Sequence, residues 1–156
     1  FIRVKKSGLS YIEEAVQNLV EKGILSKNEV CAISLKKIMT FFESELGNRI
    51  ISADEQGTLR KEQAFNLLLE YNGEEVMVQG IIDCYFEEGD EVVLVDYKTN
   101  RIDPEKDFDT EAMRMKNLYR QQLSLYKQAV ELATSKQVKQ SYLYLLSAGR
   151  EIEVLL

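Results

Sequence analysis

Residues 80–98 read GIIDCYFEEGDEVVLVDYK, and this stretch decides the fold of the chain. Two apolar runs flank the acidic segment 88–91, and this pattern predicts a β-hairpin. The second run, residues 92–95, is apolar at every position, as expected of a strand that is buried on both faces. The hairpin is therefore expected to lie inside the protein, and its side chains are expected to reach the core.

A turn centred on Gly89 and Asp90 would pair the two strands symmetrically and place Asp83 opposite Asp96, on one face. Lys98 lies two residues beyond Asp96 and would project from the same face. Two carboxylates so close repel each other, and burial makes this costly unless a cation compensates. Mg²⁺ would neutralise the pair. An ordinary Asp–Lys salt bridge at the strand ends fits the same residues.

The flanking sequence predicts a helical front followed by a β-rich core. In the front, Ser10 with Glu13 and Ser26 with Glu29 are capping-box patterns, and Gly23 and Gly47 are expected to end the two helical stretches. In the core we expect strands over 63–71, 76–86, 92–95, 138–146 and 151–154, and a helix over 110–133. This order predicts an α/β (α+β) fold with a mixed central sheet flanked by helices.

Gln122 is the polar exception on the apolar stripe of the expected helix 110–133, and Tyr126 lies one turn further along. A buried amide needs hydrogen-bond partners, so Gln122 is expected to bond the strand that bears Lys98, or a DNA phosphate. A glutamine at the edge of the core, beside a tyrosine that only packs, is the alternative.

The composition excludes several classes of function. The 156 residues contain no histidine, which removes histidine triads and histidine–zinc sites. Cys31 and Cys84 are too few for an iron–sulfur cluster or a four-thiolate zinc site. No apolar run is long enough to span a bilayer, and no signal peptide is recognisable near Phe1. Chemistry is left to carboxylates, lysine, tyrosine or a hard metal ion.

The charge is unevenly placed along the chain. A net charge of −6 argues against a protein that coats nucleic acid. Residues 112–139 nevertheless carry six cations against Glu131 alone, which indicates either a basic patch or a solvated helix face. The densely charged segment 103–111 is expected to be a mobile loop.

Several segments of the sequence resemble segments of known nucleases. Asp83, followed by Asp96-Tyr97-Lys98 at the end of an apolar strand, resembles the PD-(D/E)XK nuclease motif. With the Gln-x-x-x-Tyr pattern of Gln122 and Tyr126, these segments resemble the RecB-family nucleases. Residues 60–65 are similar to the segment in which that family has a Glu, here Glu62. Residues 41–47 of the front are similar to the AddA subunits of bacterial AddAB helicase–nucleases.

The resemblance implies a restriction-endonuclease-like core and a Mg²⁺-dependent DNA nuclease, with Mn²⁺ as a possible substitute. It implies catalytic roles for Asp83, Asp96 and Lys98, a metal held by Asp83, Asp96 and Tyr97, and supporting or DNA-binding roles for Glu62, Gln122 and Tyr126. No iron–sulfur cluster is expected. ATP would be used only by a motor elsewhere in the parent protein, because the chain contains no phosphate-binding loop.

The resemblance also implies a biological setting. The chain would be one nuclease domain, with a front over 1–55 and a core over 56–156, from the C-terminal part of a helicase–nuclease. That exonuclease would process double-strand DNA breaks in the bacterial cytoplasm with an AddB-like partner subunit. The family's upstream histidine would lie before Phe1. A catalytically silent module that binds DNA or a partner, and an unrelated small α/β domain with a salt-bridged hairpin, are the competing hypotheses.

Overall fold

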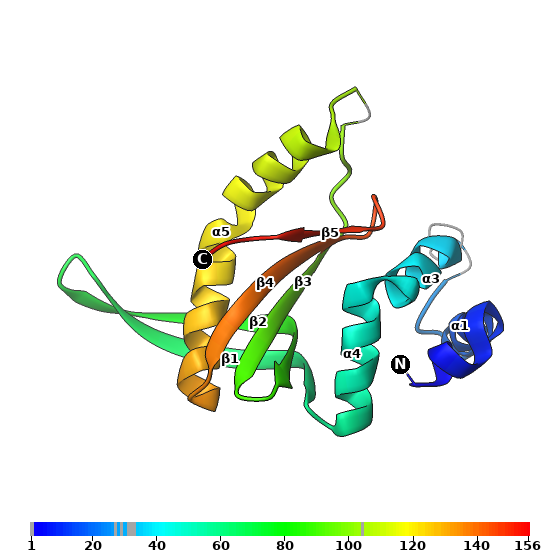
Figure 1. Ribbon diagram of the computed structural model, residues 1–156, viewed down its shortest axis with the longest axis horizontal. Helices are drawn as coiled ribbons and strands as arrows, with labels where there is room; N and C mark the ends of the chain where they lie inside the picture. Colours follow the sequence, from blue (N-terminus) through cyan, green and yellow to red (C-terminus); the bar gives the residue numbers. More distant parts are fainter. Residues whose placement is uncertain (1, 27, 29, 31–33, 104) are drawn as a thin grey trace. The chain divides into compact units, whose positions relative to one another are not determined.

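The computed structural model describes residues 2–26, 28, 30, 34–103 and 105–156. The chain forms two compact units, Phe1–Gly57 and Thr58–Leu156. The first unit contains helices α1 (Ile2–Glu21), α3 (Leu35–Glu43) and α4 (Glu45–Gln56) (Figure 1). In the part of the chain that the structure describes, no helix is both long and apolar enough to cross a membrane.

Helix α1 begins earlier than the sequence indicated. It consists of two helical segments joined at Gly8, whose backbone is non-helical with φ 58° and ψ −142°, so the predicted start at Ser10 falls near the beginning of the second segment. The segment before Gly8 was not predicted. The predicted end at Gly23 is confirmed, because the amides of Gly23 and Ile24 donate back to the carbonyls of Val20 and Leu19, both at 2.9 Å. The second expected capping box includes Glu29, which lies outside the described residues.

The prediction that Gly47 ends a helix is wrong, because Gly47 lies inside α4. The break falls at Ser44, which is both the last cap of α3 and the first cap of α4. Its hydroxyl oxygen accepts the amide of Gly47 at 3.0 Å. A Cβ atom on Gly47 would lie 1.9 Å from the carbonyl oxygen of Phe41. Glycine is therefore needed for a close approach of two backbones and not for a helix stop.

The second unit is built on a five-stranded mixed sheet, as predicted, in the order β1-β2-β3-β4-β5. Its strands are β1 (Leu59–Tyr71), β2 (Glu74–Glu88), β3 (Glu91–Lys98), β4 (Gln137–Leu145) and β5 (Arg150–Glu153). Neighbouring strands are antiparallel except β3 and β4, which are parallel. Helix α5 (Phe108–Thr134) makes the crossover between these two strands.

The core of this unit lies between α5 and the sheet. Met115, Leu123 and Val130 of α5 are fully buried in one cluster with apolar residues of all five strands. Leu118 and Ala133, whose helical spacing would continue the apolar stripe, are exposed. The buried face of α5 is therefore narrower than the hydrophobic pattern indicated.

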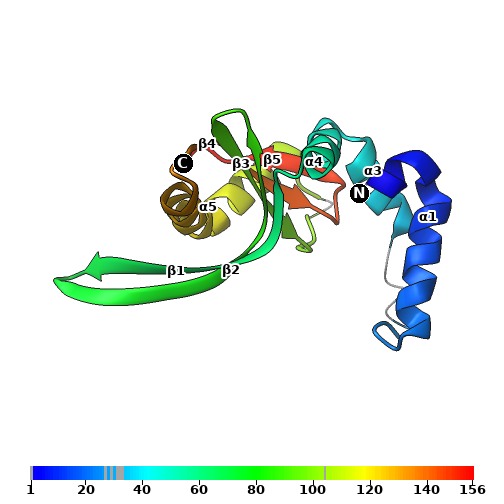
Figure 2. The same ribbon diagram turned by 90° about the horizontal axis from the view of Figure 1, so that it is seen from below.

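Strands β1 and β2 extend beyond the rest of the sheet as a long two-stranded arm (Figure 2). Their ladder runs to the pair Tyr71–Glu74, whereas β2 pairs with β3 only from Cys84 to Glu88. Residues 74–83 of β2 consequently have β1 as their single strand neighbour. We call residues 64–81 the hairpin arm.

Candidate active site

The predicted register of the β2–β3 hairpin is confirmed from the pair Cys84–Val95 to the pair Glu88–Glu91. Asp83 and Asp96 are the next residues beyond this ladder. There the carboxylate of Asp83 accepts the backbone amide of Tyr97 at 2.9 Å. The Asp83 side chain thus accepts an amide that a backbone carbonyl would accept in a continued β-ladder. This hydrogen bond holds the Asp83 carboxylate against β3.

Asp96 is the buried acid of the group, with its side chain only 1% exposed. Lys98 Nζ lies 2.6 Å from Asp96 Oδ2. Among the described residues Oδ2 accepts no hydrogen bond of regular geometry. The negative charge of Asp96 is therefore compensated by the ion pair with Lys98. Burial raises the pKa of Asp96, the contacts with Lys98 oppose that rise, and the charge of Asp83 adds to it. The structure therefore brings the two acids and the lysine together.

The ammonium of Lys98 is held from the helix side as well. It donates to Gln122 Oε1 at 3.0 Å, and Gln122 Nε2 donates to the hydroxyl of Tyr126 at 2.6 Å. The expected hydrogen bond between Gln122 and the strand that bears Lys98 is thus present. Gln122 on α5 therefore holds the ammonium of Lys98 on β3, and Tyr126 orients the side-chain amide of Gln122.

Tyr119 is a site residue that the sequence reasoning missed. Lys98 Nζ lies 4.2 Å from the centre of its ring, and its hydroxyl donates to Asn100 Oδ1 at 2.8 Å. A cation over an aromatic face is attracted by the ring's electrons. Tyr119 stands one turn before Gln122 on the same helix, and this spacing was the signal that could have identified it.

Tyr97 contributes its backbone to the site and not its phenol. Burial raises the pKa of the phenol, and its interaction with the thiol of Cys84 raises it further. Burial likewise raises the pKa of that thiol to about 12. The Tyr97 ring packs edge-on against Tyr144, with ring centres 6.4 Å apart. Tyr97 can therefore supply only main-chain atoms to an ion between the two acids.

Glu62 lies one strand away, in β1. The residues before and after it pair with Cys84 and Ile82, so Glu62 is opposite Asp83 in the register. Its backbone is left-handed, with φ 50°, which is rare outside glycine and stores strain. Its side chain is exposed. Among the described residues no three acids, cysteines or histidines converge closely enough to hold a metal ion.

The basic segment 112–139 is not a free cationic patch. Arg114 pairs with Glu111, Lys136 with Glu87, and Lys139 with Glu88, at 2.6 to 2.9 Å. Half of its six cations thus neutralise acids elsewhere in the unit. This finding removes much of the electrostatic case for DNA binding along this segment.

The sequence predicted a loop over residues 103–111. Helix α5 begins at Phe108, so the last four residues of that segment are helical. Glu111 is buried and accepts the amide of Asp103 at 3.2 Å and the guanidinium of Arg114 at 2.7 Å. These hydrogen bonds, that of Arg114 first, lower the pKa of Glu111. Glu111 thereby attaches the loop that follows Lys98 to the first turn of α5.

A Glu111→Gln variant is expected to melt a few degrees below the wild type at neutral pH. A lowered carboxyl pKa stabilises the fold above the unfolded value of 4.5, and this contribution is lost as the pH falls through the folded value. The difference in Tm should therefore shrink on acidification below that range. Thermal melts across pH measure it, with the exposed Glu105→Gln as control. A difference that is constant with pH would contradict this role.

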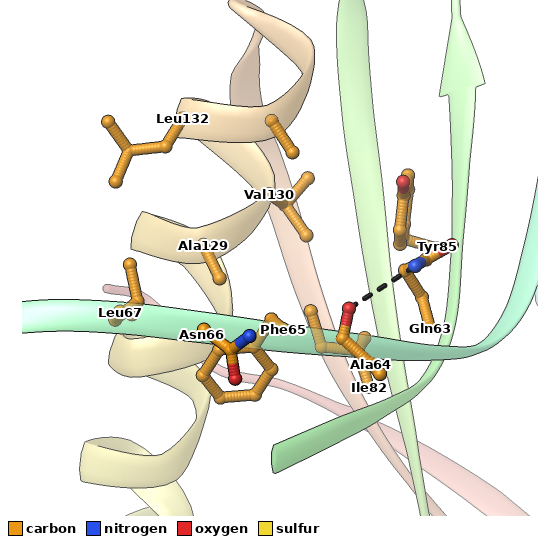
Figure 3. A pocket seen from close by; sticks show the side chains of 11 residues that line it. Gln63, Ala64, Phe65, Asn66, Leu67, Ile82, Tyr85, Ala129, Val130 and Leu132 are labelled. Carbon is orange, nitrogen blue, oxygen red and sulfur yellow. Dashed lines mark hydrogen bonds between the residues drawn. The ribbon is translucent and has the colours of Figure 1, made fainter. Parts of the chain in front are cut away.

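A separate pocket lies between the base of the hairpin arm and the C-terminal half of α5 (Figure 3). Its volume is about 500 Å³, and its lining includes Phe65, Leu67, Ile82 and Ala129. None of the site residues Asp83, Asp96, Lys98 or Gln122 lines it. The pocket is therefore distinct from the acid–lysine cluster.

Comparisons with known proteins agree with this geometry. The family model of the PD-(D/E)XK nuclease superfamily matches residues 6–154. The A subunit of the ATP-dependent helicase/nuclease of Clostridium novyi (strain NT) is 36% identical over 155 residues, which cover 92% of this chain and 12% of that protein. Its counterpart from Thermoanaerobacter sp. (strain X514) is 34% identical over 160 residues, which cover 96% of this chain and 12% of that protein. The chain thus spans only a small part of these relatives.

Proposed function

The chain belongs to the PD-(D/E)XK nuclease superfamily, and on that premise we propose that it hydrolyses phosphodiester bonds of DNA. Its similarity to helicase/nuclease A subunits supports a role as the nuclease domain of a longer helicase–nuclease. The proposal extends to an exonuclease that processes double-strand breaks with an AddB-like partner in the bacterial cytoplasm. The observation that carries it is the cluster of Asp83, Asp96 and Lys98, supported by Gln122.

The acids of this cluster suit a hard divalent cation, the kind of ion that nucleases of this superfamily generally use. Asp83 and Asp96 offer carboxylate oxygens, and Mg²⁺ is commonly bound by one or two carboxylates with water completing its shell. Burial is the main cause of the raised pKa of Asp96, Lys98 opposes it, and the nearby charge of Asp83 adds to it, so a second positive charge would further stabilise the carboxylate form. Asp83 and Asp96 would hold the ion, with the main chain of Tyr97 beside them. When bound, it would supply positive charge to the scissile phosphate.

Lys98 is proposed to place the attacking water or to stabilise charge on the phosphate. An ammonium has three N–H donors. Gln122 accepts one of them, and Asp96 pairs with the ammonium at 2.6 Å without a hydrogen bond of regular geometry. The ammonium therefore keeps donor capacity for water or for the phosphate. A water molecule attacks phosphorus and gives up a proton to solvent, the bond between phosphorus and the leaving oxygen breaks, and the leaving oxygen takes up a proton from solvent. Neither Asp83 nor Asp96 needs to form a covalent bond with the substrate.

A Lys98→Met variant tests this function. Loss of one preorganised cationic donor is expected to slow DNA cleavage roughly 10²- to 10³-fold. Lys127→Met, on the surface of α5, is the control and should leave cleavage unchanged. The measurement is cleavage of linear DNA with Mg²⁺ or Mn²⁺, alongside circular dichroism for the fold. A Lys98→Met protein that is folded and fully active would refute the proposed role.

A silent nuclease-fold module that binds DNA or a partner is the second candidate. The pairing of Asp96 with Lys98, and the lack of a third converging acid among the described residues, favour it. The same assay separates the two candidates. DNA binding without cleavage in both the wild type and Lys98→Met would support the module.

Tyr119 is expected to act on the reaction through Lys98. Tyr119→Leu removes the ring that faces the ammonium and should lower kcat about 3- to 30-fold with KM unchanged, as expected for a cation–π contact of about 0.5–2 kcal/mol. Tyr119→Phe keeps the ring and should retain most activity. Steady-state kinetics of both variants measure this. Equal losses in both would assign the effect to the Asn100 hydrogen bond.

A further inference from the structure

The hairpin arm presents to solvent a face on which large apolar side chains alternate with polar ones. Leu68 and Met77 form a cross-strand pair there and are 58% and 61% exposed, and Ile81, opposite Ala64 on the same face, is 57% exposed. The other face of the arm packs at its base, where the ring of Phe65 contacts Tyr126 of α5. The exposed polar pair Asn66–Gln79 lies between the two cross-strand pairs on the solvent-facing side of the arm. Large apolar side chains that stay exposed beside polar ones are typical of protein interaction surfaces.

The charges of the arm exclude DNA as the binding partner of this face. No lysine or arginine occurs from residue 62 to residue 97. Near its tip the arm carries Glu70, Glu74 and Glu75. Phosphate backbones are bound by cations, so this surface would repel them. We therefore take the binding partner of this acidic and partly apolar face to be the surface of a protein.

The pairing of Glu70 with Glu75 further defines that partner. The two acids lie directly opposite each other, next to the Leu68–Met77 pair. Like charges at opposed positions destabilise a ribbon, and a two-stranded ribbon is already marginal in water. A cation supplied from outside would relieve the repulsion. The matching surface is therefore apolar and carries lysine or arginine at its margin.

We propose that the hairpin arm docks on such an apolar and basic surface of another domain of the same long polypeptide. This inference rests on the proposal that the chain is one segment of a helicase–nuclease. The relatives support an intrachain partner, because this chain corresponds to 12% of their length. A domain in the same polypeptide is present at a high effective concentration, so a modest surface suffices for docking.

A Glu70→Lys variant of the full-length polypeptide tests the docking, read by hydrogen exchange of the arm's amides. In an undocked arm this change creates an attractive pair with Glu75 and should slow exchange. In a docked arm it repels the basic partner and should speed exchange about tenfold. Glu105→Lys, in the loop before α5, is the charge-matched control and should leave the arm unchanged.

Each remaining result of this measurement has a defined meaning. Slower exchange in Glu70→Lys, or a wild-type arm without protection, overturns the proposal. Protection that appears only with an added partner subunit, or only at high protein concentration, overturns the intrachain docking in favour of that subunit or of a second copy. Exchange is measured without DNA and metal, so a failure of the proposed nuclease function would not affect the result.

Discussion

Asp83→Asn and Asp96→Asn should each reduce DNA cleavage roughly 10³-fold or more. The two carboxylates are the proposed ligands of the ion, which is expected to contribute several kcal/mol to the transition state, and about 1.4 kcal/mol corresponds to a factor of ten in rate. The amide oxygen of asparagine can still accept the Tyr97 amide that Asp83 accepts at 2.9 Å. The Asp83→Asn protein is therefore expected to remain folded.

The matched control for these variants is Asp90→Asn, in the turn of the same hairpin. Asp90 is exposed, and its substitution changes the net charge by the same amount. Cleavage rates with Mg²⁺, together with thermal melts, measure the effect. Wild-type cleavage by a folded Asp96→Asn protein would mean that the buried acid serves only as the salt-bridge partner of Lys98.

Gly47→Ala is expected to destabilise the first unit by about 3 kcal/mol, at the upper end of what overpacking usually costs. The new methyl group would lie 1.9 Å from the carbonyl oxygen of Phe41, a rigid backbone atom. Helix α4 could accept it only by moving away from α3, which would break the double cap at Ser44. Urea unfolding followed by circular dichroism measures the loss.

Gly23→Ala is the control in the same unit. Gly23 has φ 69°, and among the described residues no atom lies within 4 Å of the place that a Cβ atom would take, so alanine there meets backbone strain without a clash with them. A cost of about 1–2 kcal/mol is expected from the left-handed backbone alone. If the two variants lost equal stability, the contact between Gly47 and Phe41 would not be what limits the packing of the helices.

The residues of the site that lie close in the chain could be predicted from the sequence. The short turn centred on Gly89 and Asp90 determines the hairpin register, so the approach of Asp83 to Asp96 and Lys98 followed from local rules. The bond from Gln122 to Lys98 was also within reach, since a polar residue on an apolar stripe needs an internal partner. Tyr119 on the same stripe was overlooked because an aromatic residue there also fits simple packing.

Other features depend on contacts that no local pattern encodes. Gly47 resembles a helix stop, and only the approach of the Phe41 carbonyl shows its different role. Lys136 and Lys139 looked like free cations because their partners, Glu87 and Glu88, lie far back in the chain. The left-handed backbone of Glu62 has no signal in residue type. Tertiary packing decided each of these features.

The parallel pairing of β3 with β4 imposes an order on the assembly of the site during folding. The β2–β3 hairpin closes over a tight turn, whereas β3 can pair with β4 only after the crossover through α5 has closed. Closing the longer loop costs more chain entropy and is slower. The two acids can thus meet early, while Gln122 and Tyr119 reach Lys98 only when the crossover forms. A nascent chain would hold its acidic pair before it holds a fully supported lysine.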